Sequence, residues 1–187
     1  MKDTPEVTIH IGDVYASREP VVVKTVLGSC IAAVLIDPAA GVAGMNHFML
    51  ADPIGPADDR PARFGLHAME LLIGAIQRLG GQRRRLVAKL FGGGHVLRMA
   101  ESDQSVPRRN VAFIERWCAE EHIPVLASDL GGFLARRVHL ETWSGRVLVR
   151  KLGKRDLQLT RYEEEQARET AAAAPQAAGG EVTLFDD

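Results

Sequence analysis

Two short apolar runs joined by a glycine-containing turn constrain the fold of this chain more than any other feature. Val21 to Leu27 is rich in β-branched residues, Gly28-Ser29-Cys30 follows it, and Ile31 to Ile36 is apolar again. Short β-branched runs bounded by turn residues are typical of strands. Because nearly every residue of the first run is apolar, we expect its strand to be buried on both faces. The sequence therefore places a cysteine where a buried strand gives way to a tight turn.

A third apolar run returns along the second one. Asp37 to Gly41 carries the residues of a turn, and Val42 to Leu50 is apolar apart from Asn46 and His47. We therefore expect the chain to begin as an antiparallel meander, which brings a histidine near the cysteine. Glu6 to Gly12 alternates polar and apolar residues and predicts an edge or half-buried strand.

The remainder of the chain mixes helices and strands. Phe64 to Leu79 has apolar residues at helical spacing, and Gly80-Gly81 ends the predicted helix. A second helix is predicted to begin near Ser105, with a proline in its first turn, and Ala51 to Pro61 is predicted to be a loop. Further strands are predicted at Leu86 to Phe91, Ile123 to Ser128, Leu134 to Glu141 and Arg146 to Leu152, of which the last two form a hairpin. This order predicts an α+β fold.

Length and composition bound the class of protein. The 187 residues suit one domain, and a hydrophobic content of 46% supplies a sizeable core. No apolar run approaches the ~20 residues that span a bilayer, and Met1 to Pro20 lacks the features of a secretory signal. The cytoplasm is therefore the expected compartment, without membrane insertion. Two cysteines, Cys30 and Cys118, provide neither a disulfide framework nor a zinc quartet.

The net charge of −1 hides two regions of opposite sign. Residues 155–187 hold three arginines against eight acidic residues and carry −5, whereas residues 1–154 carry +4. The chain has no basic stripe interleaved with aromatic residues, so no nucleic acid partner is expected. Arg83-Arg84-Arg85 is interpreted as a solvated turn. The acidic tail is predicted to be disordered, with the alternative that Glu181 to Asp187 is a docking peptide.

Cys30 and His47 carry the clearest chemical signal. The thiolate is the reactive form of a cysteine, so a nucleophilic cysteine needs a base nearby. Strand pairing could bring the ring of His47, seventeen residues further on, to the sulfur of Cys30. Backbone amides at Gly28 and Ser29 could bind the oxyanion of an acyl intermediate. Thr25 is the nearest candidate to orient the imidazole, and Ser29 is the alternative.

Structural roles compete with these chemical ones. A cysteine in an apolar run is most often a small buried hydrophobe, and Cys118, on an apolar helix stripe, is assigned that role. A metal site is less favoured, because no two candidate ligands stand one helical turn apart. Gly92-Gly93-Gly94 lacks the lysine and the spacing of a phosphate loop, so close backbone packing is predicted there. The candidate metal ligands are Cys30, His47, His67 and His95.

Six motifs extend the signal along the chain. They are LGSC at 27–30, GMNHFML at 44–50, K-x-FGGG at 89–94, RNV at 109–111, SDLGG at 128–132 and W-x-GRVLVRKL at 143–152. In order and spacing they resemble the chemoreceptor glutamine deamidases, the CheD family. The resemblance covers about residues 6–154, and the pair of motifs around Cys30 and His47 is its most specific part.

The resemblance implies a fold and an activity. The fold of CheD proteins is similar to a mixed β-sandwich with helices packed on the outside. For this chain the resemblance implies a single domain over residues 1–154, followed by a tail over residues 155–187. They hydrolyse glutamine side chains on chemoreceptor helices to glutamate with release of ammonia, and some also hydrolyse receptor methyl esters. The implied partners are chemoreceptor helices and a CheC-type phosphatase, and no metal or organic cofactor is implied.

The resemblance also implies site residues. Cys30 becomes the nucleophile and His47 the base, with Gly28 and Ser29 forming the turn. The family's third residue is a threonine five or six residues before the cysteine, where this chain has Thr25 or Lys24. Adjacent strand residues face opposite ways, so only one of these two can serve.

Three residues depart from the CheD pattern, and a second class of function stays open. His95, Pro107 and Phe133 replace the family's usual residues and are expected to alter how a receptor helix docks. The rival function is a non-catalytic chemotaxis binding module that docks a CheC-type phosphatase or a receptor. Thiol reactivity separates the two functions, because a site cysteine with a lowered pKa alkylates below its reference pH.

Overall fold

The computed structural model describes residues 4–50, 60–96, 105–153 and 156. The chain divides into two compact units, Met1–Gly153 and Lys154–Asp187. The docking peptide considered for Glu181 to Asp187 lies outside the described residues. The predicted loop at Ala51 to Pro61 also lies outside them, apart from its last two residues, which begin the first helix.

Nine strands form two mixed sheets in the described ranges. The four-stranded sheet has the order β1-β3-β8-β9, and β1–β3 is its parallel pair. The five-stranded sheet has the order β2-β5-β4-β6-β7, and β6–β7 is its parallel pair. The strands are β1 (Glu6–Thr8), β2 (Val14–Ser17), β3 (Val22–Leu27), β4 (Ile31–Asp37), β5 (Val42–Asn46), β6 (Val87–Gly92), β7 (Val125–Leu130), β8 (Ala135–Glu141) and β9 (Val147–Leu152).

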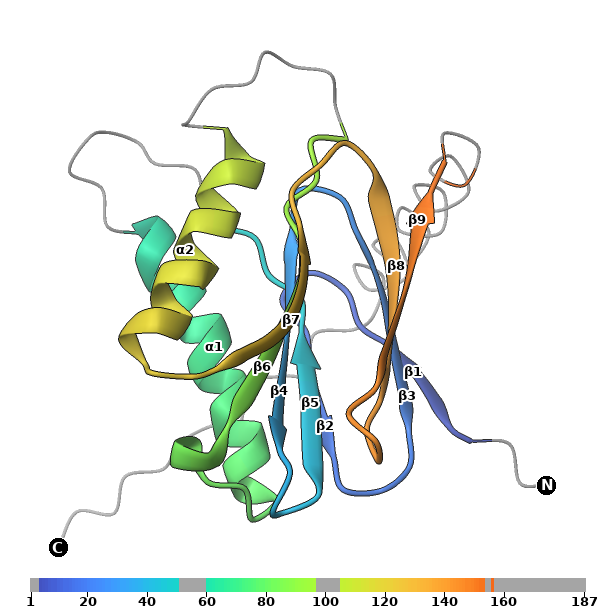
Figure 1. The fold of residues 1–187 in the computed structure, drawn as a ribbon, viewed down its shortest axis with the longest axis vertical. Coiled ribbons are helices and arrows are strands. Elements are labelled where there is room, and N and C mark those ends of the chain that lie inside the picture. The colour runs from blue at the N-terminus through green and yellow to red at the C-terminus, as the bar shows by residue number, and fades with distance from the viewer. Residues whose placement is uncertain (1–3, 51–59, 97–104, 154–155, 157–187) are drawn as a thin grey trace, which may run out of the picture. The chain divides into compact units, whose positions relative to one another are not determined.

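The two sheets face each other, and both helices cover the outer face of the five-stranded sheet (Figure 1). α1 (Arg60–Arg78) contacts β2, β4 and β5, and α2 (Val106–Glu120) contacts β6 and α1. A short 3-10 turn, η1 (Arg83–Arg85), precedes β6. The predicted α+β fold, a mixed β-sandwich with helices packed on the outside, is confirmed.

β4 contributes side chains to both hydrophobic cores. Ile31 and Leu35 pack with the helices, whereas Ala32 and Val34 pack between the two sheets. Side chains alternate along a strand, so a strand with both faces buried must be apolar at nearly every position. The uninterrupted apolar run from residue 31 to 36 is therefore the sequence signature of a central strand.

β3 differs from the prediction in two ways. It buries Val23, Thr25 and Leu27 against the other sheet, while its alternate residues are only half-buried, so it is not buried on both faces. It also pairs with β8, more than 100 residues away, and not with β4. The predicted meander is therefore wrong before β4, because an apolar run does not reveal which sheet its strand joins. As a consequence, Gly28-Ser29-Cys30 carries the chain from one sheet to the other.

The other predicted elements lie within a few residues of the observed ones, with two exceptions. No strand was expected at β2 (Val14–Ser17). The edge strand expected over Glu6 to Gly12 ends at Thr8, and a turn follows at residues 11 and 12. Both differences concern segments of three or four residues, which are too short to show a hydrophobic period.

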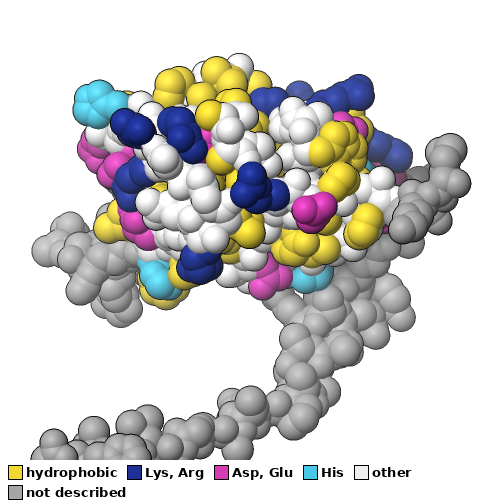
Figure 2. Space-filling view, turned by 90° about the horizontal axis from the view of Figure 1, so that it is seen from below, with side chains coloured by type: hydrophobic (Ala, Val, Ile, Leu, Met, Phe, Trp, Pro, Cys, Tyr) yellow, Lys and Arg dark blue, Asp and Glu magenta, His cyan; other side chains and the backbone are white. Residues whose placement is uncertain are grey.

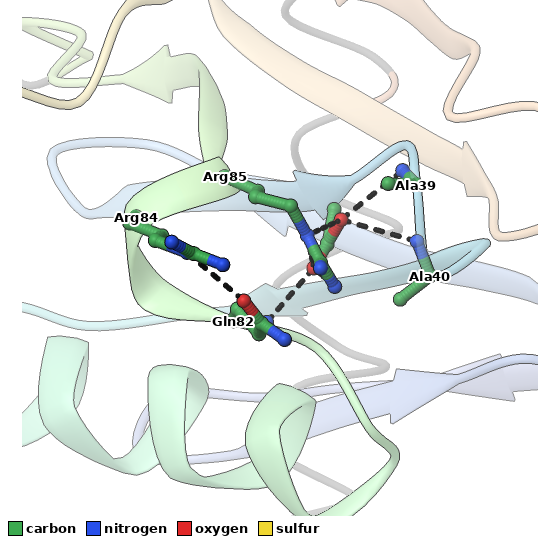
Figure 3. A network of polar contacts seen from close by, with 6 residues as sticks. Ala39, Ala40, Gln82, Arg84 and Arg85 are labelled. Carbon is green, nitrogen blue, oxygen red and sulfur yellow. Dashed lines mark hydrogen bonds and ion pairs between the residues drawn. The ribbon is translucent and has the colours of Figure 1, made fainter.

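A buried carboxylate ties the β4–β5 turn to the segment after α1 (Figure 3). Asp37 Oδ1 accepts hydrogen bonds from the backbone N–H groups of Ala39 and Ala40, both at 3.1 Å. Its Oδ2 accepts from the N–H of Gln82 at 2.8 Å and from Nη2 of Arg85 at 2.7 Å. These contacts hold the pKa of Asp37 at about 2, with the Arg85 hydrogen bond as the main cause.

The three consecutive arginines form a solvent-accessible turn before β6, as interpreted, but two of them also form ion pairs. Arg85 pairs with Asp37, which is fully buried, and Arg83 Nη2 lies 2.8 Å from Glu70 Oε1 and 2.7 Å from Glu121 Oε2. The acidic partners come from three separate segments, so a local sequence window cannot show them. On the face seen in Figure 2, basic and acidic side chains are interspersed with apolar ones.

Neither helix in the described ranges combines the length and the apolar character that a membrane span requires.

Candidate functional site

The glycine run that follows β6 supports the cysteine turn, Gly28-Ser29-Cys30, through backbone hydrogen bonds. The N–H of Gly93 donates to the carbonyl oxygen of Cys30, and the N–H of Gly94 donates to that of Gly28, both at 2.8 Å. Gly92 has a φ of +115°, and a Cβ there would lie 2.0 Å from the carbonyl oxygen of Cys30. Only glycine permits this approach. The prediction of close backbone packing for residues 92–94 is confirmed.

A buried arginine fixes the glycine run in turn. Arg136 donates from Nη1 to the carbonyl oxygen of Gly92 and from Nη2 to that of Gly131 at 2.6 Å. Its Nη2 also lies 3.3 Å from Oδ1 of Asp129. Arg136 is 1% exposed. The glycine run that supports the cysteine turn is therefore itself held in place by a buried, charged side chain.

Strand pairing places Cys30 and His47 on one face of the five-stranded sheet. Ile31 and Phe48 form an antiparallel bridge and exchange both backbone hydrogen bonds at 2.9 Å. Cys30 and His47 each stand one residue before a member of this pair, so their side chains project to the opposite face. Residues placed diagonally in this way have Cβ atoms roughly 7–8 Å apart or less, within reach of a long side chain. Their shared face is turned toward the four-stranded sheet, where Cys30 packs.

Thr25 reaches His47 across the space between the sheets. Oγ1 of Thr25 lies 2.9 Å from Nδ1 of His47 and 2.8 Å from the carbonyl oxygen of Ile9. A hydroxyl has one proton and a carbonyl oxygen can only accept, so Thr25 donates to Ile9 and accepts from His47. We therefore assign to His47 the neutral tautomer with its proton on Nδ1 and its lone pair on Nε2.

The lone pair of His47 lies in a dry environment. His47 is 3% exposed, and its Nε2 is buried without a hydrogen-bond partner among the described residues. Burial lowers the pKa of His47 to about 4, helped by His10 and opposed by Asp13 and the Ile9 carbonyl. At pH 7 the ring is neutral, so Nε2 can accept a proton on the face that Cys30 shares.

Of the candidates for the third group, Thr25 is the one that contacts His47. Lys24 faces the other side of β3, where it forms an ion pair with Glu6. Ser29 contributes its carbonyl oxygen to the turn, which accepts a hydrogen bond from Asn110. The register of the threonine is thus clear from geometry, while the catalytic roles of Thr25, His47 and Cys30 stay predictions.

Asn110, in the RNV motif at 109–111, is a buried residue that was not among the predicted site residues. It lies on α2, is 0% exposed, and donates from Nδ2 to the carbonyl oxygen of Ser29 at 2.8 Å. Its Oδ1 accepts from the N–H of Leu50 at 3.0 Å. The signal that reveals it is spacing, because Asn110 stands on the same helical stripe as Ile114 and Cys118, both buried.

The other cysteine and the two remaining candidate ligands lie elsewhere. Cys118 packs in the core between the helices and the five-stranded sheet, as predicted, and burial raises its pKa to about 11. His67 is exposed on α1, and His95 lies beside Phe133 with ring centroids 6.2 Å apart. In the part of the chain that the structure describes, no three His, Cys, Asp or Glu side chains are grouped as metal ligands.

An open pocket of about 500 Å³ adjoins the glycine run. Its lining includes Gly93, whose N–H binds the carbonyl of Cys30. It also includes His95, Pro107 and Phe133. Phe133 is 68% exposed, so this pocket offers an aromatic surface next to the cysteine turn.

Comparisons with known proteins match nearly the whole chain. A family model described as "CheD chemotactic sensory transduction" matches residues 49–151. A protein of Caulobacter sp. (strain K31) is 42% identical over 97% of this chain and 94% of its own length. Proteins of Caulobacter vibrioides (strain NA1000 / CB15N) and Burkholderia vietnamiensis are 40% and 39% identical over 98% of this chain, and over 97% and 75% of their own lengths. All three are named "Probable chemoreceptor glutamine deamidase CheD".

Among solved structures, the hypothetical protein YfiH of Bacillus licheniformis is similar with a TM-score of 0.37 and 14% identity, over 62% of this chain and 49% of its own. This likeness is too weak to support an argument about fold or function.

Proposed function

Because the chain belongs to the CheD family, we propose that it hydrolyses glutamine side-chain amides of chemoreceptors to glutamate and ammonia. In this proposal Cys30 is the nucleophile, His47 is the base, and Thr25 orients the ring of His47. One observation carries these roles. The 2.9 Å hydrogen bond from His47 to Thr25 leaves Nε2 of a buried, neutral ring without a partner, on the face that Cys30 shares.

The first step moves one proton and forms one bond. Nε2 of His47 accepts the proton of the Cys30 thiol, and the sulfur attacks the carboxamide carbon of the glutamine side chain. The carbonyl electrons move to its oxygen, which becomes an oxyanion. A ring with a pKa of about 4 is a weak base on its own. Proton transfer is nevertheless supported here, because the thiolate stabilises the imidazolium that appears beside it.

We place the oxyanion donors in the turn itself, at Gly28-Ser29-Cys30. The N–H of Ile31 already donates to the carbonyl of Phe48, and the amides of the glycine run donate to carbonyls of the turn. The backbone N–H groups next to the turn therefore already have acceptors and are not available to an oxyanion. A preorganised donor of this kind is worth ~3–4 kcal/mol of transition-state stabilisation, and amides are poor electrophiles that need it.

The tetrahedral intermediate then collapses toward products. The imidazolium of His47 gives its Nε2 proton to the amide nitrogen, the C–N bond breaks, and ammonia leaves. A thioester now joins Cys30 to the former glutamine side chain. Water loses a proton to His47 and attacks the thioester carbon, the C–S bond breaks, and the sulfur recovers a proton. The balance is one amide and one water to one carboxylic acid and one ammonia.

The test is mass spectrometry of glutamine-containing receptor fragments incubated with the protein. We expect the mass increase of deamidation at particular glutamines, and its loss in Cys30→Ala and in His47→Ala with an unchanged circular dichroism spectrum. Cys118→Ala is the matched control, because Cys118 is also a buried cysteine but lies in the other core. Deamidation by Cys30→Ala would refute the mechanism.

The second candidate function is docking without catalysis, to a receptor or to a CheC-type phosphatase. The pocket of about 500 Å³ with its exposed Phe133 favours an interaction surface at this end of the molecule. Docking and catalysis are compatible, and a protein that binds receptor fragments without changing their mass has docking alone. We place either function in the cytoplasm, where a reactive thiol is kept reduced.

A further inference from the structure

Asn110 makes one hydrogen bond to each of the two chain segments that carry the proposed nucleophile and base. Its Nδ2 donates to the carbonyl oxygen of Ser29, the residue before Cys30, at 2.8 Å. Its Oδ1 accepts from the N–H of Leu50, three residues after His47, at 3.0 Å. The side chain reaches both from α2, on the opposite side of the five-stranded sheet from Thr25.

The chemistry of the side chain suits this position. One segment offers a carbonyl oxygen and the other an N–H, so a bridge between them needs a donor and an acceptor on one short side chain. An amide supplies both, whereas a carboxylate only accepts and an aliphatic side chain does neither. Asn110 is fully buried, so water is not at hand to replace the lost contacts.

The two bonded segments are otherwise joined near the site by the bridge between Ile31 and Phe48. That bridge holds the backbone at Ile31, the residue after Cys30. It makes no hydrogen bond to Ser29, the residue before Cys30. The turn residue therefore depends on Asn110 for its lateral position, while the glycine run supports the carbonyl groups on either side of it.

We infer that Asn110 is a positioning residue, which sets the placement of the Cys30 sulfur relative to Nε2 of His47 through its bonds to Ser29 and Leu50. The inference rests on the proposed function. It assigns Asn110 no contact with substrate. Without the bridge, the cysteine turn and the histidine segment are free to separate, and the thiol loses part of its activation by His47.

The expected effect is mainly on the chemical step. A displacement of about 1 Å between reacting groups can cost about a hundredfold in rate. In Asn110→Ala we therefore expect kcat on a receptor fragment to fall about ten- to a hundredfold, with KM changed less than about twofold. Asn110→Leu keeps the branched shape of the side chain without its polar atoms, and we expect the same loss from it.

The decisive measurement is the pH profile of Cys30 alkylation by iodoacetamide, which needs no substrate. The modified peptides are separated by mass spectrometry, so that Cys118, whose pKa is raised to about 11, serves as the unreactive internal reference. The wild type and His47→Ala define the two limits of the profile. We expect Asn110→Ala and Asn110→Leu to move the half-maximal pH at least halfway from the first limit to the second.

Asp37→Asn is the matched control, because Asp37 is also a buried polar residue that joins two segments. It stands at the other end of β4, roughly 20 Å from Cys30 at the usual rise of a strand. It should lower stability and leave the alkylation profile where it is in the wild type. All profiles are recorded well below the unfolding midpoint of each variant.

The outcomes separate the two hypotheses. If Asn110 only stabilises the fold, its variants unfold at a lower temperature with the wild-type alkylation profile, and the inference is overturned. If wild type and His47→Ala have the same profile, the proposed function fails, and the inference fails with it. A shifted profile in both Asn110 variants, with none in Asp37→Asn, supports the positioning role even if no deamidation is found.

Discussion

Replacing Asp37 by asparagine should destabilise the protein by an amount that the geometry defines. The carboxylate accepts two backbone N–H bonds and one from Nε of Arg85 at Oδ1, and a backbone N–H and bonds from Nε and Nη2 of Arg85 at Oδ2. An asparagine side chain has a single oxygen and can serve only one of these two sets. With its oxygen toward Ala39 and Ala40, its NH₂ group meets the N–H of Gln82 and the Arg85 guanidinium, which are donors as well.

The cost follows from these lost contacts. Breaking a buried pair by removing one partner costs about 3–5 kcal/mol, and a buried donor without an acceptor contributes ~1–3 kcal/mol to such a loss. The side chain of Arg85 is 31% exposed, so water can reach it once the pair is broken. We therefore expect a smaller loss than for a fully buried pair, about 2 kcal/mol in the free energy of unfolding, which is typical of a hydrogen bond to a charged group.

The assay is urea denaturation of the wild type and of Asp37→Asn at pH 7 and at a series of pH values down to 2. The pKa of Asp37 is lowered from 3.8 to about 2 in the folded protein, chiefly by the Arg85 hydrogen bond. A group with a lowered pKa stabilises the fold above its unfolded pKa and loses that contribution as the pH falls through its folded pKa. The difference between the two proteins should thus be complete above about pH 5 and shrink between pH 4 and 2.

Two results would contradict this reasoning. Equal stability at pH 7 would mean that the asparagine finds other partners or that the pair contributes nothing. A difference that stays constant from pH 5 to 2 would mean that the loss comes from packing and not from the ionised carboxylate.

Three further predictions concern the proposed reaction. Thr25→Val should lower kcat by roughly one to two orders of magnitude with KM nearly unchanged, because the hydroxyl only orients His47; steady-state rates equal to the wild type would remove Thr25 from the site. The acid limb of kcat/KM should lie near pH 4, since burial lowers the pKa of His47 to about 4; a limb near ~6.5 would indicate a hydrated ring. A chain stopped at Gly153 should deamidate short receptor fragments at the full rate and be slower only on intact receptor arrays, because residues 155–187, with a net charge of −5, are proposed to act as a tether. Fragment and array rates that fall together would place the tail in the folded domain.

The parts of the fold that sequence predicted are those that depend on neighbouring residues. The amphipathic spacing of α1 and the apolar run of β4 are local patterns, as is the β8–β9 hairpin. The pairing of β3 with β8 is not local. Nothing in the apolar run of β3 distinguishes a partner seven residues away from one more than 100 residues away, so the meander prediction was wrong there.

The site shows the same division. The prediction that Cys30 lies near His47 followed from two neighbouring strand segments. The alternation of side chains along a strand puts both residues on the same face of the sheet. Alternation also required that Thr25 and Lys24 face opposite ways, but only the second sheet shows which way is inward. Thr25 is buried and contacts His47, whereas Lys24 pairs with Glu6 on the outer side. Asn110 belongs to neither segment, and its contacts are 60 and 81 residues away in the chain, beyond any local pattern.

The hydrogen bond between Thr25 and His47 has a mechanical consequence. Thr25 belongs to the four-stranded sheet, whereas Cys30 and His47 are held by the five-stranded one. The imidazole is therefore anchored to both layers, and moving the layers apart along this bond by about half an ångström lengthens it beyond the normal 2.7–3.2 Å range of an N–H···O contact. The orientation of the His47 ring therefore depends on how the two sheets pack against each other, and not on the five-stranded sheet alone.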